Sequence, residues 1–250
     1  MSINADNLYD ILYTSVKHIE SYQAFSNILN KQTLEDYHTA DLLKALFNKR
    51  YICAYEQGLQ RSLVGYAFMR ALKNYDSNFK FIMIVKNGDI EAVAKDLQSY
   101  CKFKVTYSTA ETKVIDKKLV AKDFITSDVL LLTHECLNNI AVMNIVYHVR
   151  SYFKGLIIDN ANELSNIQGS QSAFSLLTMA KNFLYVLALC DSSIVKNPPL
   201  LTNLFYIINR RSVGNFRQTE DIIRLDGYEI FTNILSVRTK HKPGVMSSYL

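Results

Sequence analysis

The chain has 250 residues, of which 49% are hydrophobic and 20% are charged, and its formal net charge is +5. This composition is typical of a globular protein and excludes a fibrous or largely disordered chain. Glycine (8) and proline (3) are scarce, so we expect one large domain rather than several joined by linkers. No apolar run reaches the length of a membrane span, and the polar first residues do not resemble a signal peptide. We therefore expect a soluble, cytoplasmic protein.

The potential metal ligands are scattered along the chain. The four cysteines form no CxxC pair, and the five histidines have no ligand spacing. We expect buried free thiols, with neither a disulfide framework nor a metal site. The cysteines are Cys53, Cys101, Cys136 and Cys190.

Taken in order, apolar strands alternate with helical segments. Residues 1–33 have apolar positions on one helical face and predict a helical N-terminal extension, and a second helix is predicted from about residue 33. Strands are then predicted at 52–54, 79–85, 103–108, 128–133, 153–159 and 183–189. Helical segments are predicted at 63–72, 90–100, after 133, at 173–181 and at 200–209.

This alternation predicts an α/β fold. Apolar strands separated by helices form a mostly parallel sheet covered on both faces. We expect one such domain at 34–250, ending in a basic tail, beside the 1–33 extension. In these folds ligands bind at the carboxyl ends of the strands.

Three of the predicted strands end in suggestive sequences. The first is followed by Glu56–Ser62, which resembles a phosphate-binding loop between a strand and a helix. The fifth ends in Asp159, followed by Asn160. The sixth ends in CDSS at 190–193, followed by IVKNPPLLTNL at 194–204.

In this order, the three sequences resemble the first RecA-like lobe of superfamily 2 helicases, and most closely the Snf2-type DNA translocases. The corresponding family motifs are GLGKT, DEAH and TGTP, the last before a segment like IQNNPLELYNL. Residues 34–38 (LEDYH) are similar to the family's LRPYQ, with His38 in the glutamine position, and 128–137 (DVLLLTHECL) to its DVVITSYETL. The resemblance covers about residues 34–240. It implies a RecA-like fold and an ancestral ATP–magnesium site.

The departures from the family fall on the catalytic positions. Gly58 is retained, but Gln60 and Arg61 replace the glycine and lysine that approach the phosphates. Ser62 retains a hydroxyl that can hold magnesium, and Asp159 retains the carboxylate that assists it. Asn160 replaces the glutamate that activates water, and an amide cannot accept a proton. Asn162 replaces the coupling histidine, and the TGTP sequence is lost as well.

These losses lead us to expect no ATPase activity and no bound ATP or magnesium. A second expectation concerns nucleic acid. The family's nucleic-acid-facing loops correspond here to Lys86, Thr133 and His134, and the C-terminal basic cluster supplies Arg238, Lys240 and Lys242.

The favoured hypothesis is a catalytically inactive, helicase-like binding or scaffolding subunit in DNA replication, transcription or repair. Its partner would be a helicase, polymerase or nuclease, and the Lys-, Asn-, Ile- and Tyr-rich composition would suit a phage or viral source. One alternative is a nucleotide-binding module whose ATPase groups a partner completes in trans. Another is a protein that binds nucleic acid directly.

Overall fold

The computed structural model describes residues 34–114, 116–164, 171–208, 221, 224 and 234–240. The predicted extension at 1–33 lies outside these residues. The described part forms a seven-stranded sheet in the order β3-β4-β2-β5-β6-β1-β7, in which every strand pair is parallel. The strands are β1 (Arg50–Tyr55), β2 (Phe81–Val85), β3 (Val105–Ser108), β4 (Val129–Thr133), β5 (Gly155–Ile158), β6 (Tyr185–Asp191) and β7 (Leu235–Arg238).

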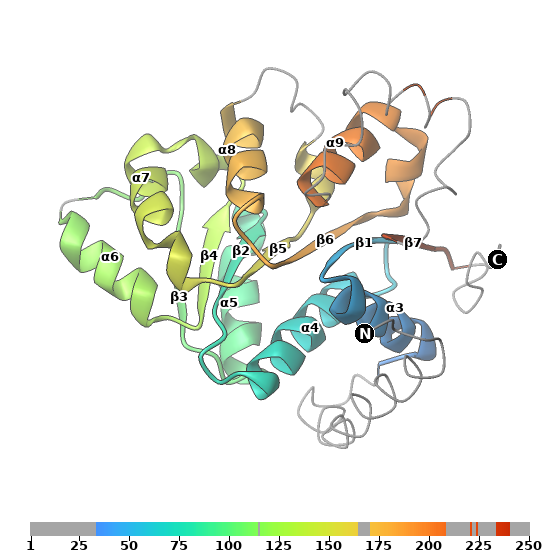
Figure 1. Ribbon diagram of the computed structural model, residues 1–250, viewed down its shortest axis with the longest axis horizontal. Helices are drawn as coiled ribbons and strands as arrows, with labels where there is room; N and C mark the ends of the chain where they lie inside the picture. The colour runs from blue at the N-terminus through green and yellow to red at the C-terminus, as the bar shows by residue number, and fades with distance from the viewer. Residues whose placement is uncertain are drawn as a thin grey trace, which may run out of the picture.

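Helices cover both faces of the sheet, as the sequence predicted (Figure 1). One face carries α3 (Asp36–Asn48), α4 (Arg61–Tyr75) and α5 (Ile90–Ser99). The other carries α6 (Lys117–Thr126), α7 (Ile140–Val149), α8 (Gln171–Ala180) and α9 (Pro198–Ile208).

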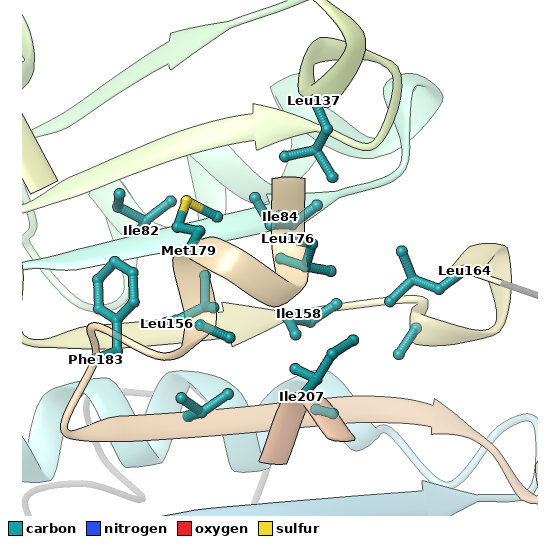
Figure 2. Packing of buried hydrophobic residues seen from close by; sticks show 14 of the residues in the cluster. Ile82, Ile84, Leu137, Leu156, Ile158, Leu164, Leu176, Met179, Phe183 and Ile207 are labelled. Atoms are coloured by element: carbon teal, nitrogen blue, oxygen red, sulfur yellow. The ribbon is translucent and has the colours of Figure 1, made fainter. Parts of the chain in front are cut away.

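The alternation of side chains along each strand explains why the strands are apolar throughout. In β1, Ile52 and Ala54 join the core under α7, α8 and α9, while Tyr51, Cys53 and Tyr55 join the core under α3, α4 and α5. Because both faces are covered, neither set of side chains meets water. Figure 2 shows the first of these cores, where α8 packs on the middle of the sheet.

Six strands and most of the helices confirm the sequence prediction, with ends that move by a few residues. Helix α6 was missed, although Val120, Ala121 and Ile125 pack on the core beside the buried Phe124 at helical spacing. It begins after Asp116, whose carboxylate accepts hydrogen bonds from the N–H groups of Lys118 and Leu119. The sequence also predicted no strand at 235–238, where the structure has β7.

A buried polar network holds β7 on the sheet. The Asp41 carboxylate on α3 is fully buried and accepts hydrogen bonds from Tyr55 Oη (2.6 Å), Ser236 Oγ (2.6 Å), and Arg238 Nε (2.9 Å) and Nη2 (2.6 Å). Tyr51 Oη continues the network to Ser236 Oγ at 2.7 Å. Such a network is stabilising when every member has a partner.

A second arginine joins two helix ends. Arg50, the first residue of β1, donates hydrogen bonds to backbone carbonyls at the ends of α8 and α9 and in the connection from α8 to β6. Carbonyls at helix C-termini lack intrahelical partners and carry partial negative charge, so one guanidinium satisfies several of them. The acceptors are the carbonyls of Ala180, Phe183, Ile207 and Ile208.

Candidate functional site

The loop between β1 and α4 has a backbone held by local and long-range hydrogen bonds. Within it, Leu59 N–H donates to the Glu56 carbonyl at 3.1 Å. Glu56 N–H donates to the carbonyl of Arg238 at 2.8 Å, and the Glu56 carboxylate accepts from Lys240 N–H at 2.7 Å. Two hydrogen bonds therefore join the loop after β1 to the end of β7 and the residues that follow it.

Two loop residues have left-handed backbone. Gly58 has φ 95°, which glycine adopts without strain, whereas Gln60 has φ 50° and carries a side chain. A non-glycine residue in this region costs about 1–2 kcal/mol. Gln60 occupies the position of the second glycine in the GLGKT motif of the resembling family.

Arg61 and the end of β5 are brought together at the carboxyl edge of the sheet, although β6 lies between β5 and β1. Arg61 lies at the start of α4, and its Nε is 3.5 Å from Asp159 Oδ1, while its Nη2 donates to Asn160 Oδ1. The guanidinium therefore spans Asp159, which matches the aspartate of the family motif, and Asn160, which stands in the place of its glutamate. Ser62 lies in the same first turn and is partly exposed.

Asp159 is buried, with 7% of its surface exposed. Burial raises the pKa of its carboxyl, and the Arg61 charge and the Asn160 N–H (2.8 Å) partly offset that rise. Asn160 has left-handed backbone, and its side-chain Nδ2 lies 3.4 Å from Asp89 Oδ2. Asn160 thus links the loop after β5 both to Arg61 and to the loop after β2.

One link was missed from the sequence. Asn162 lies in a short 3₁₀ turn (Ala161–Leu164), and its Oδ1 accepts a hydrogen bond from Asp191 N–H at 2.6 Å. This hydrogen bond joins the segment after β5 to the end of β6, and no local pattern in the sequence predicted it.

His38, in the family's glutamine position, is almost fully buried at the other side of the loop. Its Nε2 lies 2.8 Å from the Leu59 carbonyl, and its Nδ1 accepts from Glu35 N–H at 3.1 Å. These contacts fit the neutral tautomer with the proton on Nε2. Burial lowers the pKa of His38, and the hydrogen bond to the Leu59 carbonyl opposes that shift.

Some of the residues predicted to face nucleic acid are exposed, and others are partly or fully buried. Lys86 is exposed and lies 3.4 Å from Glu163, and Lys240 is exposed beside Gly58. His134 is half-buried, with Nε2 at 2.9 Å from the Asp159 carbonyl. Its pKa is lowered, chiefly by burial.

Two predicted contacts must be corrected. Thr133 is fully buried and its Oγ1 accepts from Cys136 N–H at 3.1 Å, because the last residue of β4 still lies within the core. Arg238 is 2% exposed and paired with Asp41, so it is not part of a surface cluster. Lys242 lies outside the described residues.

Other features of the described residues concern metals, thiols and membranes. All four cysteines are buried and free, as predicted. No group of three or more His, Cys, Asp or Glu side chains in the described ranges is placed to hold a metal ion. Across the same part of the chain, no helix combines the length and apolar character needed to cross a bilayer.

Comparison with known proteins identifies the fold. The sequence matches no protein-family model and no curated protein. The structure is similar to the SWI2/SNF2 ATPase core of Sulfolobus solfataricus in complex with double-stranded DNA, with a TM-score of 0.65 and 16% identity over 84% of this chain. The same core domain alone gives a TM-score of 0.64 at 16% identity over 84% of this chain. The UvsW helicase of bacteriophage T4 gives 0.53 at 17% identity over 75%.

These similarities establish an α/β fold like that of a RecA-like ATPase lobe. The chain spans 45% and 44% of the two Sulfolobus chains and 65% of the phage helicase. It thus corresponds to part of each.

Proposed function

We propose that this chain, which has the fold of a RecA-like lobe, is a catalytically inactive helicase-like protein that acts as a binding or scaffolding subunit in a DNA transaction. Its partner would be a helicase, polymerase or nuclease engaged in replication, transcription or repair. We also propose a phage or viral origin, for which the composition is the support. The observation that carries the proposed inactivity is the position of Arg61 across Asp159 and Asn160.

The chemistry of these residues supports the absence of hydrolysis. A lysine at the Arg61 position would reach the phosphates as a compact ammonium, but the planar guanidinium here is held by Asp159 and Asn160. Magnesium would have to compete with Arg61 for the Asp159 carboxylate. Asn160 offers no basic oxygen to take a proton from water, so general-base catalysis at this position is lost.

The support for a scaffolding role is the retention of the fold beside this altered site. Both cores are continuous, and the strand ends remain joined by Asn160 to Asp89 and by Asn162 to Asp191. A protein selected for its surface keeps these features while its pocket chemistry changes.

Thermal unfolding with and without Mg-ATP tests the inactivity. A ligand that binds only the folded state raises its stability by RT ln(1 + [L]/Kd), so we expect no shift for the native chain. A matched variant combining Gln60→Gly, Arg61→Lys and Asn160→Glu restores the family residues and should gain a shift. Stabilisation or ATP hydrolysis by the native chain would refute the proposal.

Scaffolding itself is tested by purification of the tagged chain from its native source. We expect a helicase, polymerase or nuclease to remain bound after a high-salt wash, and reconstitution from purified components should reproduce the complex. If no such protein binds in reconstitution, the scaffolding role is wrong.

A second candidate is a nucleotide site completed in trans. The retained hydroxyl of Ser62 and the Asp159 carboxylate favour it, since they are the parts of the site that the chain has kept. This candidate predicts that Mg-ATP stabilises the complex with the partner but not the chain alone.

A third candidate is direct DNA binding through the exposed Lys86 and Lys240 at the carboxyl edge of the sheet. Its support is the fold shared with a Sulfolobus core that was solved with double-stranded DNA. A salt-dependent mobility shift with duplex DNA that weakens in Lys86→Ala would favour it.

A further inference from the structure

Four exposed large hydrophobic residues lie in or near the segments that enter the sheet at its amino edge, opposite the site described above. Seven such residues are exposed among the described residues, and four of them precede the central strands. Isolated exposed hydrophobic residues are normal on protein surfaces, but a cluster indicates a binding surface. The four, with their exposed fractions, are Phe47 (50%), Tyr75 (89%), Tyr152 (53%) and Leu184 (44%).

The sheet topology brings the segments that carry these four residues into one row along an edge of the sheet, two of them entering from each face. The central strands are adjacent in the order β2-β5-β6-β1, and all are parallel, so the residues before them lie at one edge. Tyr75 precedes β2, Tyr152 precedes β5, Leu184 precedes β6 and Phe47 precedes β1. Strands lie about 4.8 Å apart, so the row is on the order of 15 Å long. The ion pair between Lys154 Nζ and Asp76 Oδ2, at 2.6 Å, joins the segment that carries Tyr152 to the segment that carries Tyr75.

Lysines follow the same arrangement. One lysine precedes each of the four strands, and three of them are exposed. The connections from the preceding helices contain a single carboxylate, that of Asp76, and Lys154 already neutralises it. The edge is therefore electropositive. The lysines are Lys49, Lys80, Lys154 and Lys181, of which Lys80 is partly buried and bonded to the Ile125 carbonyl.

We propose that this row, the amino-edge surface, binds single-stranded nucleic acid without strong sequence preference. Three of its four apolar side chains are aromatic, and every base has a π-face that can stack on such rings. The interleaved lysines provide charge for a phosphate backbone, and a single strand leaves its bases free to stack. A double helix does not offer its base faces, which is why the occupant is a single strand.

This surface is distinct from the carboxyl edge that holds Lys86 and His134. Five residues of strand separate the two edges, which is about 17 Å. The proposal goes beyond the proposed function and does not depend on it, since it uses none of the residues that argue for inactivity.

Fluorescence anisotropy with a fluorescein-labelled dT20 oligonucleotide tests the surface. We expect binding at low salt, and a loss of affinity of about tenfold or more when Tyr75→Ala and Tyr152→Ala are combined, since each stacked base is lost. Tyr107→Ala is the matched control, because Tyr107 is 51% exposed on the edge strand β3, outside the row. Circular dichroism and melting curves should show that these surface variants remain folded.

The salt dependence tests the lysines separately. Removing two phosphate contacts with Lys49→Ala and Lys181→Ala should reduce the slope of log affinity against log salt by about 1.4. The control pair, Lys95→Ala and Lys122→Ala, removes exposed lysines of α5 and α6 and should leave the slope unchanged.

Three results would overturn the proposal. The first is the absence of dT20 binding at low salt, and the second is equal binding by the tyrosine pair variant and the Tyr107 control. The third is tight binding of a synthetic acidic, phenylalanine-containing peptide at this edge in place of dT20, which would assign the surface to a protein partner. Each of these results leaves the inactivity argued from Arg61 untouched, because Mg-ATP binding is measured independently.

Discussion

The Asp41 network provides a sharp test of what holds the last strand in place. Asp41 lies on α3, and its two carboxylate oxygens accept four hydrogen bonds, two of them from the buried Arg238 on β7. In Asp41→Asn the shape is unchanged, but one oxygen becomes an NH₂ group. Whichever way the amide is turned, that NH₂ faces an N–H group of the Arg238 guanidinium, which cannot accept a hydrogen bond, and Arg238 loses the negative charge of Asp41.

The expected loss follows from this geometry. Removing one partner of a buried ion pair costs about 3–5 kcal/mol, because an uncompensated charge remains in the core. For a domain of this size, 1 kcal/mol changes the melting temperature by about 2–4 °C, so we expect Asp41→Asn to melt about 6–20 °C lower. Urea unfolding should show the same loss in midpoint with little change in slope.

Two controls separate charge burial from packing. Asp76→Asn breaks the exposed pair with Lys154 and should leave the melting temperature unchanged. A double variant, Asp41→Leu with Arg238→Met, removes both charges and should lose less stability than Asp41→Asn alone. The reasoning is refuted if Asp41→Asn melts within 2 °C of the native chain, or if the double variant is the less stable of the two.

Three further predictions concern stability and pH. Arg50→Met removes the guanidinium that donates to backbone carbonyls at the ends of α8 and α9, and it should lower the free energy of unfolding in urea by about 2–4 kcal/mol. Arg50→Lys should recover only part of that stability, because one ammonium cannot span both helix ends. Gly58→Ala should lower the stability of the fold by about 1 kcal/mol, because its φ is left-handed, while Gln60→Gly on the same loop should not lower it. The backbone argument is wrong if Gly58→Ala melts at a higher temperature than Gln60→Gly. Burial lowers the pKa of His38, so below about pH 6.5 the unfolded chain binds a proton that the folded chain does not, and stability should fall as the pH drops to 5. His38→Gln should flatten that fall in urea midpoints measured at pH 5, 6 and 7, and an unchanged profile would show that other groups cause it.

The sequence predicted that the residues following the parallel strands lie at one edge of the sheet. Parallel strands carry their carboxyl ends to one edge, so Arg61 and Asp159 meet although 98 positions separate them. What each side chain contacts was not predictable. The sequence suggested a surface role for Arg238 because of its basic neighbours, but its carboxylate partner lies 197 positions away on α3. No local pattern records such a pairing.

The sequence by itself determined the alternation of apolar strands and helices, because burial on both faces of a parallel sheet requires uninterrupted apolar runs such as those of β1 and β4. It also suggested that Gln60, Arg61 and Asn160 depart from the motifs of the resembling family, and the proposed inactivity rests on their chemistry. Only the tertiary structure decided that Arg61 is held by Asp159 and Asn160, that Thr133 and Arg238 are buried, and that the residues before four neighbouring strands form one row. The physical reason is that hydrophobic periodicity is a local signal, whereas hydrogen-bond partners and surface neighbours depend on the order in which the strands assemble.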